Sequence, residues 1–314
     1  MKQRVIACIF PAFGMKYRQF NPKEINGFEH IFDNFLHRAA DVLPIDPEMI
    51  RQVHALSVKE IEDDLTKHYL CYLNNCTISE IFKLAGIHAD YAAGYSMGLF
   101  SALYHSAAVS FEDGLLLMHH VCTYAHEFSG DCDYGMGAII GIPFGRVIDL
   151  ISELGYSLEL ADIILENVGI VSGIKSEIES LFHAARQRGA IDTKLLPVAL
   201  PYHASWMKDA EHKIGRYLSQ IHISDPQCIV ISGVDQKLIK TADDIRTEAR
   251  TNVSHHISWY GTMNKLIELG VNTFIESGCS QNLCMFAKNF SGDFICIHPK
   301  KIRKYYDLKA ATWF

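Results

Sequence analysis

The residues with the clearest chemical potential lie in the stretch Gly94-Tyr95-Ser96-Met97-Gly98, which has the form Gly-x-Ser-x-Gly. In a nucleophile elbow, two such glycines let the backbone turn sharply from a strand into a helix, and the turn exposes the serine hydroxyl. The N-terminus of that helix is electropositive, and its N–H groups, including that of Met97, can hold the negative charge of a tetrahedral intermediate. The pattern therefore predicts Ser96 as a nucleophile, although five residues of common types need support from their context.

The flanking sequence predicts the elements that an elbow requires. Residues 77–86 indicate a helix that ends at Gly86, and residues 87–93 form a short apolar run typical of a buried strand. After the serine, apolar residues recur at helical spacing, and Ser110 followed by two acidic residues indicates the start of another helix. Strand, turn and helix are thus expected in the required order.

Composition places the chain among ordinary globular proteins, because 49% of its 314 residues are hydrophobic. The net charge of −7 argues against partners such as nucleic acid or an anionic membrane. The apolar run at residues 5–10 is too short to span a bilayer and lacks a signal-peptide cleavage pattern, so we interpret it as a first buried strand. Nine scattered cysteines without a CxxC pair predict neither a disulfide framework nor a structural zinc site, and favour a cytoplasmic location.

The order of predicted elements indicates an α/β fold in two parts. Strands and helices alternate as β-α-β-β-α-β within residues 128–198, which predicts an inserted ferredoxin-like subdomain. Residues 1–127 and 199–298 form a large α/β-hydrolase-like domain around a central, mostly parallel sheet. Its expected elements are a helical layer at 26–84, helices at 114–126, 208–218 and 260–269, and further strands at 228–232 and 273–276. Residues 299–314, basic and then aromatic, are interpreted as a docking tail.

Three histidines of one predicted helix, His119, His120 and His126, raise the question of a metal site. Adjacent histidines point to different sides of a helix, and no carboxylate falls at ligand spacing. We therefore assign these side chains to packing and to the surface, and expect no metal.

Taken together, the chain resembles the malonyl-CoA:acyl carrier protein transacylase family, which includes the acyltransferases of polyketide synthases. The resemblance covers almost the full length and rests on four landmarks in the family's order. These are the N-terminal loop at residues 10–14, the nucleophile motif at 94–98, the histidine motif Pro201-Tyr202-His203, and the late turn at 276–280. The predicted subdomain also lies where the family carries its own.

The resemblance implies a Ser–His dyad in which His203 takes the proton of Ser96 as Ser96 attacks a thioester. A backbone carbonyl orients the histidine in the family, and Asn252, seven residues before Trp259, occupies that place. The backbone N–H groups of Phe13 and Met97 correspond to the oxyanion hole. The resemblance further implies no bound cofactor, acyl-CoA or a phosphopantetheinyl carrier protein as substrate, an acyl carrier protein as partner, and a monomer.

Departures from the family pattern bear on the acyl group. Family members that use malonyl-CoA carry an arginine that pairs with the free carboxylate, and ungapped alignment places Val121 there. Phe13 stands where the family usually has Gln, Tyr95 where it has His, and Leu99 where it has Glu. Together with Tyr202, beside the histidine, we assign Val121, Tyr95 and Leu99 to acyl specificity, and we expect a neutral acyl group.

Three functions remain after these observations. The favoured one is S-acyl transfer to an acyl carrier protein in polyketide or related biosynthesis. An acyl hydrolase that clears carrier proteins is the alternative, since loss of the arginine is compatible with such editing enzymes. An inactive carrier-protein-binding module is disfavoured because Ser96, His203 and Asn252 are all retained.

Overall fold

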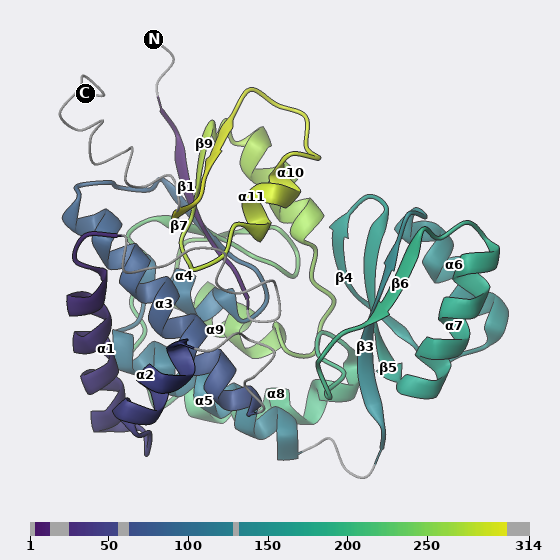
Figure 1. Ribbon diagram of the computed structural model, residues 1–314, viewed down its shortest axis with the longest axis horizontal. Helices are drawn as coiled ribbons and strands as arrows, with labels where there is room; N and C mark the ends of the chain where they lie inside the picture. Colours follow the sequence, from purple (N-terminus) through teal and green to yellow (C-terminus); the bar gives the residue numbers. More distant parts are fainter. Residues whose placement is uncertain (1–3, 13–24, 56–62, 128–131, 300–314) are drawn as a thin grey trace.

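The computed structural model describes residues 4–12, 25–55, 63–127 and 132–299, and all structural statements below concern these residues. Phe13, most of the polar helical segment expected before Leu65 and nearly all of the tail lie outside this part of the chain. The described elements form two sheets with their own helices (Figure 1).

The larger sheet has the strand order β10-β9-β1-β2-β7-β8, with β1 and β2 at its centre. All neighbouring strands are parallel except β7 and β8, which pair antiparallel. Its strands are β1 (Ile6–Phe10), β2 (Tyr91–Gly94), β7 (Ile229–Ile231), β8 (Leu238–Ile239), β9 (Thr273–Glu276) and β10 (Ile295–Ile297). Both central strands are nearly continuously buried, as expected for a parallel sheet covered by helices.

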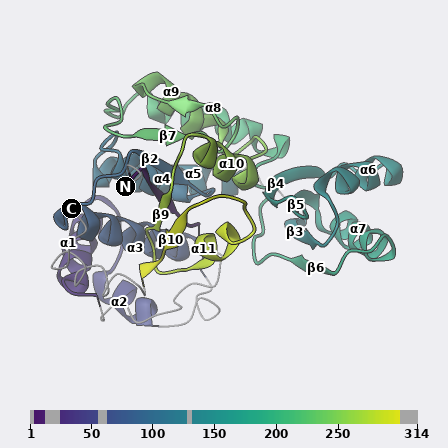
Figure 2. The ribbon, with the colours of Figure 1, turned by 90° about the horizontal axis from the view of Figure 1, so that it is seen from above.

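Helices enclose this sheet, with α1, α2 and α3 on one side of the molecule and α8 and α9 on the opposite side (Figure 2). They are α1 (Phe28–Val42), α2 (Pro47–Ala55), α3 (Asp64–Leu84), α4 (Gly98–His105), α5 (Phe111–Glu127), α8 (Lys208–Leu218), α9 (Ala242–Thr251), α10 (Trp259–Glu268) and α11 (Asn282–Ala287). The short helix α4 packs directly on β1 and β2 and against α3 and α5. One apolar core therefore joins the sheet to the helices around the predicted elbow.

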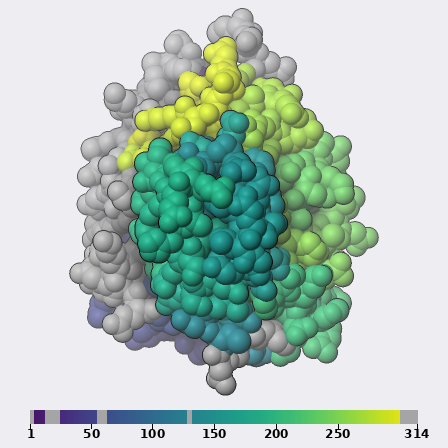
Figure 3. Space-filling model, turned by 90° about the vertical axis from the view of Figure 1, so that its right-hand side faces the viewer, coloured from purple at the N-terminus to yellow at the C-terminus, as the bar shows by residue number. Residues whose placement is uncertain are grey.

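The smaller sheet forms the subdomain at the right of Figure 1. Its elements follow the chain as β3 (Tyr134–Ile140), α6 (Phe144–Leu154), β4 (Glu159–Leu165), β5 (Val168–Ile174), α7 (Lys175–Gln187) and β6 (Asp192–Leu195). The strand order β4-β5-β3-β6 is antiparallel throughout, and the subdomain has a separate apolar core under α6 and α7. In the space-filling view the subdomain stands forward of the large domain (Figure 3). The predicted α/β class with an inserted β-α-β-β-α-β unit is confirmed.

Some local expectations need correction. The strand before the elbow begins at Tyr91, four residues later than predicted, because residues 87–90 form an irregular segment with a bend at Asp90. Strands β8 and β10 were not predicted, since two or three residues give no readable periodicity. The cysteines were expected to be unpaired, yet Cys284 of α11 and Cys296 of β10 form a disulfide. These two elements pack against each other, which the sequence did not indicate.

None of the helices in the described ranges has the length and apolar character needed to cross a bilayer.

Candidate active site

The Gly-x-Ser-x-Gly stretch forms a tight turn between β2, which ends at Gly94, and α4, which begins at Gly98. A Cβ on Gly94 would lie 2.2 Å from the backbone nitrogen of Leu99, and one on Gly98 would lie 2.1 Å from the carbonyl oxygen of Phe10. Only glycine fits at either position, because both obstacles are backbone atoms. Ser96 sits at the apex with a φ of 51°, a left-handed conformation that is uncommon outside glycine. The turn therefore has the geometry of a nucleophile elbow.

His203 lies in the loop between β6 and the short 3-10 helix at Ser205–Met207, and its side chain reaches the elbow. Its Nε2 lies 2.7 Å from the Ser96 Oγ, although 107 residues separate the two in sequence. The backbone of His203 also has a positive φ, 59°, and its N–H donates to the Val253 carbonyl oxygen at 2.8 Å. Ser96 and His203 thus meet through tertiary structure alone.

The second ring nitrogen of His203 determines the tautomer. Nδ1 lies 2.6 Å from the backbone oxygen of Asn252, and a carbonyl oxygen can only accept a hydrogen bond. Nδ1 therefore carries the proton and donates it, which leaves Nε2 as the acceptor for the Ser96 hydroxyl. The structure places the Asn252 carbonyl where the histidine needs an orienting group.

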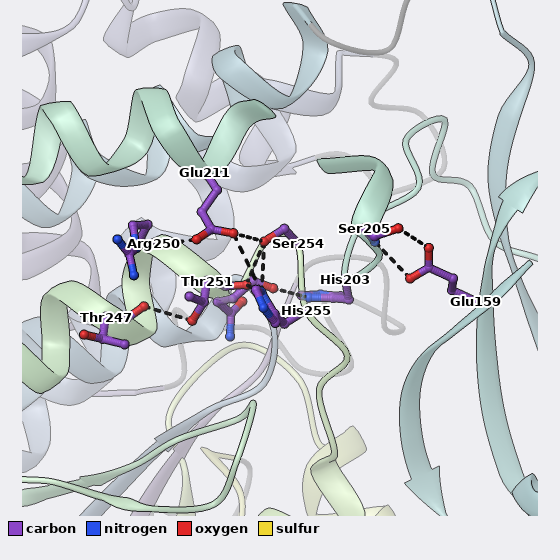
Figure 4. Close-up of polar contacts among 10 residues, drawn as sticks. Glu159, His203, Ser205, Glu211, Thr247, Arg250, Thr251, Ser254 and His255 are labelled. Carbon is purple, nitrogen blue, oxygen red and sulfur yellow. Dashed lines mark hydrogen bonds and ion pairs between the residues drawn. The ribbon is translucent and has the colours of Figure 1, made fainter. Parts of the chain in front are cut away.

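The loop that carries Asn252 is held from the side of α8 (Figure 4). The Ser254 hydroxyl donates to Glu211 Oε2 at 2.8 Å, and Arg250 Nε lies 3.5 Å from the other oxygen of the same carboxylate. On the other side of His203, the Ser205 N–H donates to Glu159 of β4 at 2.9 Å. The histidine therefore sits between two anchored segments.

Burial controls the protonation of His203, which is only 5% exposed to solvent. Burial lowers its pKa to about 4, the hydrogen bond to Asn252 opposes this shift, and the nearby His256 adds to it. At neutral pH the ring is uncharged, so Nε2 can accept a proton. This is the state that a general base needs before the reaction.

A cavity of about 90 Å³ opens next to Ser96 and His203. Its described lining consists of Ala12, Asp64, His68, Tyr95, Ser96, Met97, Met136, Asp162, Ile170, Leu196, Val198, Tyr202 and His203. The elbow and the histidine loop form one wall, and the subdomain strands β3, β4 and β5 contribute another. The site is therefore built between the large domain and the subdomain.

Two carboxyl groups distinguish this cavity. Tyr95 donates its hydroxyl to Asp162 Oδ2 at 2.7 Å, and the Trp259 N–H donates to Oδ1 at 3.3 Å. Burial raises the pKa of Asp162 to about 7, while these hydrogen bonds oppose the rise. At Asp64, burial also disfavours ionisation, but the hydrogen bond and charge of His68 and the charge of Lys67 bring its pKa below the usual value. The cavity thus contains Asp64, whose lowered pKa keeps it ionised, and Asp162, whose pKa lies near neutral pH.

The residues assigned to acyl specificity differ in whether they line the cavity. Tyr95 and Tyr202 line the cavity, and the Tyr202 hydroxyl is buried without a hydrogen-bond partner among the described residues. Val121 of α5 and Leu99 of α4 are buried in the apolar core and are not part of the described lining. Met97 lines the cavity at the start of α4, as expected for an oxyanion-hole residue, whereas Phe13 lies outside the described residues.

Sequence reasoning missed Asp64 and Asp162. A signal for Asp162 was present, because it is the one acidic residue within the apolar part of the strand Glu159–Leu165. A carboxyl group in such a strand is costly unless it has partners or a function. Asp64 had no comparable signal, since acids are common in the first turn of a helix.

Comparison with known proteins yields sequence relatives but no matching family model. Malonyl CoA-acyl carrier protein transacylase of Bacillus subtilis (strain 168) is 30% identical over 204 residues, which are 64% of this chain and 64% of the relative. Polyketide biosynthesis protein ThaF of Burkholderia thailandensis is 30% identical over 190 residues, 60% of this chain and 16% of the relative. The match thus spans less than two thirds of either relative.

Solved structures share the fold over nearly the whole chain. An acyl-carrier-protein S-malonyltransferase from Burkholderia pseudomallei superposes with a TM-score of 0.87 at 22% identity, covering 97% of this chain and 100% of that one. A malonyl transacylase solved in complex with a type II polyketide synthase acyl carrier protein gives 0.86 at 21% identity, covering 94% and 95%. At these identities the likeness establishes the architecture.

Proposed function

We propose that the protein is an S-acyltransferase that moves a neutral acyl group from a thioester to an acyl carrier protein through an acyl-serine intermediate. The observation that carries this proposal is the contact of 2.7 Å between Ser96 Oγ and His203 Nε2 at the start of α4. An uncharged histidine in this tautomer can accept a proton only at Nε2, which faces the serine.

The proposed reaction has two symmetric halves. Ser96 Oγ bonds to the thioester carbonyl carbon as its proton passes to His203 Nε2, and the oxyanion is stabilised by N–H groups such as that of Met97. The carbon–sulfur bond then breaks, and the departing thiol takes the proton from Nε2. In the second half, the thiol of the carrier protein loses its proton to Nε2 and its sulfur bonds to the acyl carbon. The bond from that carbon to Ser96 Oγ then breaks, and Oγ takes the proton from Nε2, which regenerates the Ser96 hydroxyl.

The charges in the cavity support a neutral acyl group. Asp64 and Asp162 line it, and no arginine or lysine belongs to its described lining. A malonyl carboxylate would share the cavity with the Asp64 carboxylate, with no arginine or lysine in the described lining to pair with it, a cost of several kcal/mol for a buried charge. Apolar side chains such as Met136, Ile170 and Leu196 suit an uncharged chain instead.

The names of the similar proteins support an acyl carrier protein as the partner. Three of the four similar proteins described above act on, or are solved with, an acyl carrier protein according to their names, and two are tied to polyketide biosynthesis. We therefore propose a phosphopantetheinyl carrier protein as the acceptor, in polyketide or related biosynthesis.

Intact-protein mass spectrometry with acetyl-CoA, butyryl-CoA and malonyl-CoA tests the proposal. We expect an adduct of the acyl mass from the neutral thioesters, little from malonyl-CoA, and none in Ser96→Ala, because Ser96 is the serine of the described cavity lining and its hydroxyl faces His203. Ser219→Ala, an exposed serine at the end of α8, is the matched control and should acylate like the wild type.

Adding a phosphopantetheinylated carrier protein to the acylated enzyme separates transfer from hydrolysis. Transfer moves the acyl mass to the carrier protein, whereas release of the free acid with the carrier protein unmodified would support the alternative of an acyl hydrolase. Equal adducts in Ser96→Ala would remove Ser96 as the nucleophile, and a preference for malonyl-CoA would contradict the neutral-acyl proposal.

A further inference from the structure

A buried glutamate lies one helical turn before Asn252. Glu248 of α9 is 4% exposed, and its carboxylate accepts three hydrogen bonds. The Ser232 hydroxyl donates to Oε2 at 2.6 Å, while the Gly233 N–H and the Asn252 side-chain amide donate to Oε1 at 2.9 and 3.3 Å. A carboxylate so deeply buried has a structural or functional reason to be there.

The same glutamate also contacts the main chain of Asn252. The Asn252 N–H donates to the Glu248 carbonyl oxygen at 2.9 Å, as the last backbone bond of α9. Asn252 is therefore held by Glu248 through both its backbone and its side chain, and its own carbonyl then accepts from His203 Nδ1 at 2.6 Å. The chain of contacts runs from the carboxylate to the imidazole in two steps.

On its other side, Glu248 joins this chain of contacts to the C-terminal end of strand β7 in the large sheet. Ser232 directly follows β7, and its oxygen also accepts from the N–H groups of Val234 and Asp235 at 3.1 and 3.0 Å. Since these groups occupy the acceptor side of Ser232, its proton is directed to Glu248. The carboxylate thus connects β7, the end of α9 and the carbonyl that orients His203.

Among the residues that the structure describes, no lysine, arginine or histidine forms an ion pair with Glu248. Beside it lies a small cavity of about 180 Å³, where Asp235, Lys237 and Asp244 also face the space around Glu248. Lys237 pairs with Asp235, and Asp244 caps α9. Burial raises the pKa of Glu248, and its three hydrogen bonds oppose that rise. Its negative charge is therefore stabilised mainly by dipoles, including that of the Asn252 amide.

From this geometry we propose that Glu248 is a positioning residue for His203, acting through Asn252. It holds the Asn252 carbonyl in line with Nδ1, and its charge favours the imidazolium that forms when Ser96 gives up its proton. The inference rests on the proposed Ser96–His203 dyad and assigns the dyad a buried carboxylate that it contacts only through the Asn252 peptide.

Phosphonylation of Ser96 by a fluorophosphonate probe tests this without knowledge of the acyl substrate. In that reaction Ser96 Oγ bonds to phosphorus, its proton goes to His203, and fluoride leaves. The rate is measured from pH 3.5 to 8 in the full chain, with thermal unfolding of each variant. Glu248→Gln keeps the shape but removes the charge. Asp243→Asn, which removes one charge from an exposed position on the same helix, is the control.

We expect Glu248→Gln to lower the plateau rate by about tenfold, as misplacement of a reacting group does. The acid limb should stay near pH 4, because the raised pKa of Glu248 leaves its carboxyl largely protonated where His203 titrates. Asp243→Asn should match the wild type in both respects. An unchanged plateau rate in folded Glu248→Gln would overturn the inference, as would a rate loss with a matching loss of thermal stability.

Should Glu248→Gln not fold, Ser232→Ala gives the test. It removes one donor to the Glu248 carboxylate and so weakens the hold of Glu248 on Asn252, which should lower the plateau rate by a smaller factor with the acid limb still near pH 4. An unchanged plateau rate in folded Ser232→Ala would then overturn the inference. If the wild type itself is not labelled at Ser96, the proposed function fails and this inference fails with it.

Discussion

At the scale of single residues, both members of the proposed dyad occupy a left-handed backbone conformation, with φ values of 51° for Ser96 and 59° for His203. Such a conformation costs roughly 1–3 kcal/mol for a residue with a side chain, so the surroundings must impose it. Hydrogen bonds hold both backbones: the Leu99 N–H donates to the Ser96 carbonyl oxygen, and the His203 N–H donates to the Val253 carbonyl oxygen. Backbone strain here coincides with the 2.7 Å contact between the side chains.

The pH dependence of Ser96 reactivity follows from the burial of His203. Because its pKa is lowered to about 4, the ring is already neutral above about pH 5. We expect the rate of Ser96 phosphonylation to rise around pH 4 and to be level from pH 5 to 7. His212→Ala, which removes an exposed histidine of α8, should leave this profile unchanged. A rise centred near pH 6.5, the value of a free histidine, would contradict the lowered pKa of His203.

At the scale of elements, the site depends on how closely α4 approaches the sheet. Helix α4 starts immediately after the elbow and packs on β1 and β2, so its first residue lies against the end of β1. Gly98 makes this approach possible, because any Cβ there would overlap the Phe10 carbonyl. The glycine that follows the nucleophile therefore sets the position of the whole helix.

Gly98→Ala should disturb that packing and the reaction together. Overpacking against a backbone atom should lower the free energy of unfolding by roughly 1–3 kcal/mol, and displacement of α4 should slow labelling of Ser96. The matched control is Gly145→Ala near the start of α6, where a Cβ meets nothing within 4 Å. There alanine should stabilise the helix by roughly 0.5–1 kcal/mol. Urea unfolding of both variants measures the difference, and equal effects would contradict the packing argument.

At the scale of the whole molecule, the subdomain is fastened to the large domain beside the cavity. The Ile257 N–H donates to the Ala161 carbonyl at 3.0 Å, and the Ser172 hydroxyl donates to the Tyr202 carbonyl at 2.7 Å. Asp162 of β4 completes this junction by accepting from Tyr95 of the elbow. One wall of the active site is thus held in place by the contact between the two parts.

Asp162 should make the stability of this junction depend on pH. Its pKa is about 7 in the folded protein against an ordinary value near 4, so between these values the folded state binds a proton that the unfolded state does not. Stability from this group is therefore present at low pH and is lost as pH rises through about 4 to 7. The asparagine of Asp162→Asn does not titrate. As pH rises through that window, the free energy of unfolding of the variant should therefore increase relative to that of the wild type by up to about 1.4 kcal/mol per pH unit.

Urea unfolding at pH 5 and pH 8 measures this effect. Asp149→Asn, which removes an exposed aspartate of α6, should differ from the wild type equally at the two pH values. The prediction fails if the free energies of unfolding of Asp162→Asn and the wild type also differ by the same amount at pH 5 and pH 8.

Local sequence alone determined the helices, strands and turns whose residue pattern is strong and is complete within a few neighbouring residues. The elbow could be predicted because glycine, serine and glycine at alternate positions leave the backbone few other conformations. The strand Thr273–Glu276 and the helix Lys208–Leu218 coincide with their predictions because apolar spacing is read over a few neighbouring residues. The subdomain was equally visible, since its elements follow one another without leaving the unit.

Tertiary structure alone decided which distant groups meet. Nothing local to residue 203 shows that its ring faces Ser96, and the carbonyl of Asn252 leaves no trace in residue type, so both were expected from resemblance only. The carboxyl groups of Asp64, Asp162 and Glu248 escaped prediction because burial is a property of the packed fold. Val121 shows the converse, since alignment placed it at the acyl group while the described cavity lining does not include it. Residue spacing constrains the chain over a turn or a strand, whereas a cavity is formed by side chains from elements that only packing brings together.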